Sequence, residues 1–124
     1  TPDKAIWMIE QTNHPNLKLD LDISHFYVEG ADIEYSVNLC APHSVMVHIK
    51  DGVIEEGNVK YCLTGEGTID INGFISSLKL NGIDNLPIYA EVSVQQSDNI
   101  DYDPWQTAQF CFDVLNSARK TKVT

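Results

Sequence analysis

Three stretches of the chain alternate between apolar and polar residues, which is the pattern of a half-buried β-strand. The stretches are LKLDLD, SVMVHIK and LPIYAEVSV, at residues 17–22, 44–50 and 86–94. Each has one apolar side, which is formed by Leu17, Leu19 and Leu21, by Val45, Val47 and Ile49, and by Ile88, Ala90 and Val92. We therefore expect three strands whose apolar sides pack beneath helices.

Between these strands the apolar residues recur at helical spacing. Helices are predicted at 3–13, 31–40 and 70–82, and a last one that begins near Pro104. The residues expected to face inward are Ile33, Val37 and Cys40, then Phe74 and Leu78, and finally Ala108, Phe112 and Leu115. Segment 51–70 carries four glycines and is predicted to be a loop.

Strict alternation of helix and strand predicts an α/β fold with parallel strands joined by right-handed crossovers. Three parallel strands cannot close into a barrel, and both outer edges of such a sheet stay open. The chain also lacks a starting Met. We therefore expect it to need a missing half, a partner chain or a second copy of itself.

Composition narrows the class of protein. Eighteen acidic residues against eight Lys and Arg give a net charge of −10, which argues against a nucleic-acid partner. No apolar run approaches the length of a membrane helix, and the first residues lack the features of a signal peptide. Cys40, Cys62 and Cys111 show no metal-ligand spacing and are interpreted as reduced thiols of a cytoplasmic protein.

The polar sides of the three strands carry potential ligands at or near their carboxyl ends, namely Asp22, His48 and Glu91. Ligands of parallel α/β folds bind at these ends. Two carboxylates and an imidazole suit a divalent metal ion. Taken singly, Asp22 could cap a helix, His48 could be a hydrogen-bonded core residue, and Glu91 could pair with Lys50.

The segments LKLDLDISHF, VMVHIKDG and LTGEGTIDINGFISSLKLNGIDNLPIYAEVSV resemble strand-end motifs of the xylose-isomerase-like barrels. That superfamily joins sugar and sugar-phosphate isomerases and epimerases with apurinic endonucleases. The motifs are DxxH, HxKD and GEGxID, followed by a strand-eight Glu. The resemblance covers residues 4–119 and implies a parallel-stranded (β/α) barrel of the TIM type. Residues 1–124 would be its carboxyl-terminal half, about strands six to eight with their helices.

The resemblance implies that Asp22, His48 and Glu91 hold a divalent metal, which is manganese, cobalt, zinc or magnesium. The fourth ligand, a Glu that ends strand five, would precede Thr1. His25 matches a position that contacts substrate oxygen, and Lys50 matches a Lys that follows the metal histidine in the family. HVHIKD is the commoner form of this motif, and Met46 replaces its first histidine.

The implied function is a metal-dependent sugar or sugar-phosphate isomerase or epimerase. Such an enzyme moves a proton next to a carbonyl, through a cis-enediolate. Glu91 would act as a base, and His25 would hold a substrate oxygen or shuttle its proton. The expected partners are a small sugar or sugar phosphate and the missing half of the barrel or further copies of the chain.

Three other classes of protein compete with this interpretation. An apurinic endonuclease needs an Asp-x-His pair before the GEG turn, where this chain has Val59 and Tyr61. A flavodoxin-like fold needs a phosphate-binding turn after its first strand, and DISHFYVEG does not supply one. A non-enzymatic half-barrel that serves as a binding or accessory protein stays open, and metal content would discriminate it from an enzyme.

Overall fold

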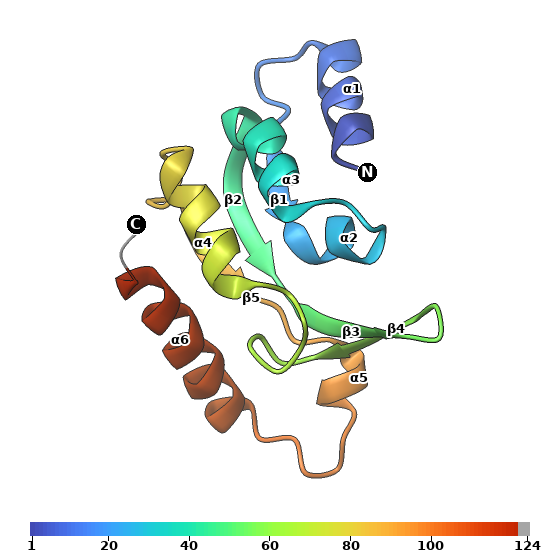
Figure 1. The fold of residues 1–124 in the computed structure, drawn as a ribbon, viewed down its shortest axis with the longest axis vertical. Coiled ribbons are helices and arrows are strands. Elements are labelled where there is room, and N and C mark those ends of the chain that lie inside the picture. The colour runs from blue at the N-terminus through green and yellow to red at the C-terminus, as the bar shows by residue number, and fades with distance from the viewer. Residues whose placement is uncertain (122–124) are drawn as a thin grey trace.

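The central sheet of the computed structural model, which describes residues 1–121, has three parallel strands. They are β1 (Leu19–Asp22), β2 (Ser44–Ile49) and β5 (Ile88–Ala90), in the order β1-β2-β5. The longer helices are α1 (Pro2–Thr12), α3 (Ile33–Cys40), α4 (Ile71–Leu80) and α6 (Pro104–Lys120), with α1 and α6 at opposite ends of the molecule (Figure 1). The predicted α/β class and parallel strands are therefore confirmed. No helix within residues 1–121 is long and apolar enough to cross a membrane.

The apolar sides of the strands meet the inward sides of the helices in one core. Val47 and Ile49 of β2 are completely buried there, as are Phe74 and Leu78 of α4. Leu21 of β1 joins them with almost no exposed surface. Burial of this apolar surface is the main stabilising contribution, and it fixes which side of the sheet the helices cover.

Acidic residues begin three of the four longer helices. The carboxylates of Asp32, Asp70 and Asp103 accept hydrogen bonds from backbone N–H groups in the first turns of α3, α4 and α6. Each such cap contributes about 1 kcal/mol. Part of the acidic excess of the chain therefore serves its fold.

A short helix that the sequence pattern did not predict, α2 (Ile23–Val28), follows β1 directly. Asp22 is its N-cap, and Asp22 Oδ1 accepts from Ser24 N at 3.0 Å and from Ser24 Oγ at 2.5 Å. Six residues are too few to display a helical repeat, so the sequence offered no periodic signal for α2.

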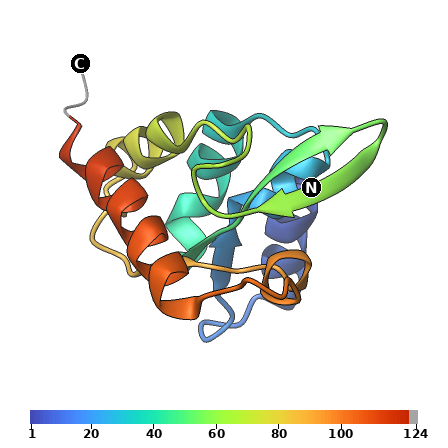
Figure 2. The same ribbon diagram turned by 90° about the horizontal axis from the view of Figure 1, so that it is seen from below.

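The prediction of a loop over 51–70 was wrong for its first part. The chain there forms an antiparallel hairpin of β3 (Asp51–Glu55) and β4 (Asn58–Cys62), which extends away from the body of the molecule on the side opposite α6 (Figure 2). Its two-residue turn, Glu56 and Gly57, has φ angles of 50° and 79°. Positive φ at both positions is the geometry that suits the twist of a tight hairpin.

The strand expected at 86–94 is shorter in the structure. Only Ile88–Ala90 forms β5, and Val94–Ser97 forms the short helix α5. Ser93 caps α5, since its hydroxyl accepts from Gln95 N at 3.2 Å. The chain therefore begins a helix at the Ser93 cap, although the alternating pattern of the sequence continues to Val94.

Three residues expected to face inward are exposed, namely Val45, Ala108 and Phe112. Val45 is the extra residue of an irregularity in β2, because Leu19 pairs with Ser44 while Asp20 pairs with Met46. Phe112 is 60 % exposed, since α6 buries the side that carries Cys111 and Leu115 instead.

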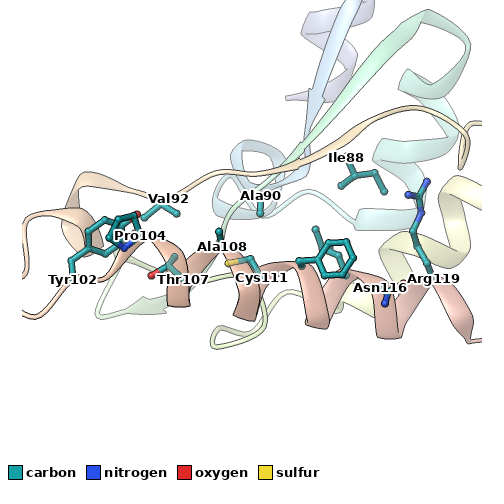
Figure 3. Close-up of a pocket in the computed structure, with 12 residues that line it drawn as sticks. Ile88, Ala90, Val92, Tyr102, Pro104, Thr107, Ala108, Cys111, Asn116 and Arg119 are labelled. Atoms are coloured by element: carbon teal, nitrogen blue, oxygen red, sulfur yellow. The ribbon is translucent and has the colours of Figure 1, made fainter.

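A groove of about 370 Å³ lies between β5 and α6 and is mostly apolar (Figure 3). Ile88 and Ala90 line it from the strand, while Ala108, Cys111 and Phe112 line it from the helix. Within residues 1–121, β1 and β5 pair only with β2, so both outer edges of the sheet are open. The groove therefore runs along an open edge of the sheet.

The three cysteines are free thiols. Burial raises the pKa of Cys40 and of Cys62 to about 11, and it also raises the pKa of Cys111. A thiol with a raised pKa is a poor nucleophile at neutral pH. These cysteines therefore serve as small packing residues in the part of the chain that the structure describes.

Candidate active site at the carboxyl ends of the strands

The register of the sheet brings the predicted ligands to one face. Asp22 pairs with His48, and His48 pairs with Tyr89. Paired residues of neighbouring strands point to the same side, so these three side chains share the face opposite the buried residues of the core. Glu91 N donates to Ile49 O at 2.8 Å, which continues the ladder past the end of β5. Glu91, two residues after Tyr89, therefore belongs to the same polar face.

Asp22 is bonded through both carboxylate oxygens. Oδ1 caps α2, and Oδ2 lies 3.3 Å from His25 Nε2. The side chain of Asp22 is largely covered, whereas that of His25 is 63 % exposed. The DxxH motif therefore folds into one turn in which the aspartate orients an exposed imidazole.

His48 lies between two other side chains of the polar face. Its Nδ1 is 3.4 Å from Asp20 Oδ2, and its ring meets the Tyr89 ring edge to face, with the centroids 5.2 Å apart. Nε2 takes part in none of the interactions within residues 1–121. Sequence reasoning did not assign Asp20 to the site, although its position two residues before Asp22 places it on the same side of β1.

Lys50 and Glu91 form the closest ion pair of the site, with Lys50 Nζ 2.7 Å from Glu91 Oε1. The ammonium also lies 4.8 Å from the centre of the Tyr61 ring, within the range of a cation–π interaction. The Lys50 side chain is only 8 % exposed and that of Glu91 is 42 % exposed.

The pKa of Glu91 lies below its ordinary value. The main cause is the hydrogen bond from Lys50, with smaller contributions from the charges of Lys50, His48 and His25, whereas burial acts in the opposite direction. Glu91 is therefore a carboxylate at neutral pH, and both histidines lie close enough to influence it.

Tyr61 was missed because segment 51–70 was predicted to be a loop. Both of its backbone groups are held by α5: Tyr61 N donates to Gln95 Oε1, and Tyr61 O accepts from Gln96 Nε2, each at 2.8 Å. These bonds fix the hairpin against the segment that follows β5. They place the Tyr61 ring beside Lys50.

Asp51, the last residue of the HxKD motif, organises the GEG loop. Its buried carboxylate accepts hydrogen bonds from the backbone N–H groups of four residues at 2.8–3.1 Å: Gly52, Gly65, Gly67 and Ile69. A Cβ atom on Gly67 would overlap this carboxylate, so glycine is required there. The loop next to the candidate site is therefore built around an internal anion.

A divalent cation fits the donor types of this face, which offers two carboxylates and an imidazole on adjoining strands. Glu91 Oε2 and His48 Nε2 make no hydrogen bond or ion pair within residues 1–121. Each therefore has a lone pair that can bind a metal ion. In that part of the chain, no three His, Cys, Asp or Glu side chains are already gathered into a metal-binding cluster. Metal ligation by Asp22, His48 and Glu91 therefore stays a prediction.

Solved structures share this architecture. A xylose isomerase domain protein from Alicyclobacillus acidocaldarius subsp. acidocaldarius matches with a TM-score of 0.77 and 24 % identity. A xylose isomerase domain protein from Planctomyces limnophilus matches with a TM-score of 0.74 and 20 % identity. An L-ribulose 3-epimerase matches with a TM-score of 0.68 and 22 % identity. The matches cover 96–97 % of this chain but only 42–43 % of the others, so the chain spans less than half their length.

None of the curated protein sequences compared with the chain matches it. A family model does match, over residues 1–110, and it describes a xylose isomerase-like TIM barrel. The match covers most of the chain and agrees with the parallel strands, although the described residues form no closed barrel. The chain belongs to the xylose isomerase-like TIM barrel family.

Proposed function

We propose that the chain is the carboxyl-terminal half of a sugar isomerase or epimerase that depends on a divalent metal. One observation carries the proposal. In a chain of this family, Asp22 and His48 are in register on the polar face of the sheet, and Glu91 follows on the same face at the carboxyl ends. Active sites of TIM barrels lie at these ends.

Asp22, His48 and Glu91 would hold the metal, and a further ligand would come from outside these residues. When bound, the cation would polarise the substrate carbonyl and stabilise the negative charge that forms beside it. The α2 cap supports Asp22 in this role, since it fixes the carboxylate at the end of β1. The contact with Asp20 similarly supports His48, because it orients the ring and leaves Nε2 free.

Glu91 would take the proton from the carbon next to the carbonyl. Its ion pair with Lys50 fixes Oε1, so Oε2 would be the oxygen that both ligates the metal and accepts the proton. Glu91 is ionised at neutral pH, as a base must be, and the hydrogen bond from Lys50 that lowers its pKa also makes it a weaker base. His25, exposed beside Asp22, is placed to bind a substrate oxygen or to carry its proton.

A polypeptide that supplies the other half of the barrel would complete this site, either in the same protein or as a further copy or partner. The open edges of β1 and β5 and the groove beside α6 support this proposal. The exposed Phe112 in that groove supports it as well, since a covering strand or helix would bury its ring. A compact monomer in sizing experiments on the isolated chain would count against it.

The proposed function is tested by hydrogen exchange at carbon. The assembled barrel, loaded with Mn²⁺ and incubated with ketoses and aldoses in deuterated water, should place deuterium on the carbon next to the carbonyl. This label arises because the transferred proton exchanges with solvent during the reaction. A metal-loaded protein that incorporates no deuterium into any sugar of the panel would rule out the proposed reaction.

A further inference from the structure

We propose that the substrate of this site is an uncharged, unphosphorylated sugar and not a sugar phosphate. This inference rests on the function proposed above and narrows its substrate class. TIM barrels often bind phosphate with the loops after their last two strands and with the start of a short extra helix. In this chain three groups at that place could bind phosphate, and most of their donors are already bonded within the protein; Val94 N at the start of α5 is the one backbone donor of that helix with no acceptor among the described hydrogen bonds.

The first group is the ammonium of Lys50. It lies 2.7 Å from Glu91 Oε1 and against the Tyr61 ring, and its side chain is almost completely covered. A phosphate could reach it only by displacing Glu91 or Tyr61. Displacing Glu91 would remove the carboxylate that the reaction needs, so Lys50 serves as a positioning residue for Glu91.

The second group is the glycine-rich loop between β4 and α4. Loops of this kind bind phosphate through backbone N–H groups that point to one place. Here the N–H groups of Gly65, Gly67 and Ile69 point to the Asp51 carboxylate, at 2.9, 3.0 and 3.1 Å. The protein's own carboxylate thus occupies the position that an external anion would take.

The third group is the start of α5. Gln95 N donates to Ser93 Oγ at 3.2 Å, and the N–H groups of Gln96 and Ser97 donate to Ser93 O at 2.8 and 3.0 Å. Ser93 is itself buried, and the side chains of Gln95 and Gln96 are bonded to Tyr61. Three N–H groups of this four-residue helix are therefore satisfied internally.

The polar face also offers a phosphate few cationic side chains. Asp20, Asp22 and Glu91 carry carboxylates there, whereas Lys50 is the one Lys or Arg among the described residues that contacts any of them. Arg119 lies at the other end of β5, near Ile88, and donates to Asp84 O (Figure 3). A neutral polyhydroxyl sugar bridged by a divalent cation suits such a surface, and a dianionic ester does not.

Phosphate titration of the assembled barrel, with this chain isotope-labelled, tests this inference without relying on turnover. Inorganic phosphate is added over the millimolar range while the Lys50 ammonium and the amide signals of Gly65 and Gly67 are followed by NMR. No saturable shift is expected in the parent chain. In the matched variant Glu91→Gln, Lys50 loses its anionic partner, and its signal should then respond to phosphate.

A saturable shift of Lys50, Gly65 or Gly67 in the parent chain would overturn the inference.

Turnover is the second test, in which the assembled barrel is given D-ribulose or D-fructose and their phosphate esters. We expect kcat/KM for the free sugars to exceed that for the esters by at least about 10-fold, because the groups that could hold the ester phosphate are bonded within the protein. A preference for the esters would reject the substrate class while leaving the isomerase function in place. Turnover of neither kind would reject the function, and the titration would still decide the phosphate question.

Discussion

Replacing Glu91 with Gln should lower turnover by about 10²–10⁴-fold, which is the usual contribution of a positioned general base. Gln retains an oxygen that can bind a metal, but its amide cannot take up a proton. Deuterium transfer to ketoses and metal content by elemental analysis should be measured together. We expect the Glu91→Gln protein to keep some metal and to lose the reaction.

Two comparisons make this result specific. His48→Ala should lose metal before anything else, and added metal should partly restore its activity, because His48 is proposed only to hold the ion. Glu55→Gln removes the same charge from the exposed end of β3 and should react like the parent. If Glu91→Gln turns over substrate at the parental rate, Glu91 is not the base and the proposed mechanism is wrong.

Replacing Asp51 with Ala should destabilise the chain by at least about 3 kcal/mol, because each buried donor left without a partner costs about 1–3 kcal/mol. The Asp51 side chain is 1 % exposed and accepts from four backbone N–H groups that have no other acceptor among the described hydrogen bonds. Water cannot easily replace it at a buried position. The measurement is the free energy of unfolding by urea.

Asp70→Ala is the matched control. Asp70 is also an aspartate that accepts from a backbone N–H group, but it is exposed and only caps α4 through Gly73. The loss of such a cap costs about 1 kcal/mol. Equal destabilisation by the two substitutions would show that the Asp51 carboxylate is no more important than an ordinary helix cap.

Alternation of apolar and polar residues predicted the strands, because a strand that is buried on one side places every second side chain in the core. Leu21, Val47 and Ile49 were assigned to the core on this basis and are buried. The pattern failed at Phe112, where helical spacing indicated an apolar stripe but not what covers it. Phe112 lies in the groove beside β5 and keeps 60 % of its surface exposed among the described residues.

Local turn chemistry accounts for the elements that were missed. The β3–β4 hairpin depends on positive φ at Glu56 and Gly57, and Glu at the first of these positions is not a common signal for such a turn. Helix α5 depends on a cap from Ser93 that overrides the alternation around it. Both elements are short, and the side chains of Gln95 and Gln96 in α5 join them through hydrogen bonds to Tyr61.

The candidate site was predictable where it follows strand register, and not where it follows loops. Asp22, His48 and Glu91 could be placed on one face because each lies at the end of a strand. The contact of Tyr61 with Lys50 depends on the hairpin and on α5, which the sequence did not reveal. Hydrogen bonds to Asp51 join residues up to 18 positions apart, and no pattern marks such a pairing in advance.

The central claim, a divalent cation on the polar face of the sheet, is tested most directly by adding Mn²⁺ to the assembled barrel in which this chain is isotope-labelled. A paramagnetic ion broadens the NMR signals of the nuclei nearest to it. The amide signals of Asp22, His48 and Glu91 should broaden first, and His48→Ala should abolish this effect. Broadening centred on the acidic hairpin tip, at Glu55 and Glu56, with the signals of Asp22 and His48 unchanged, would contradict the claim.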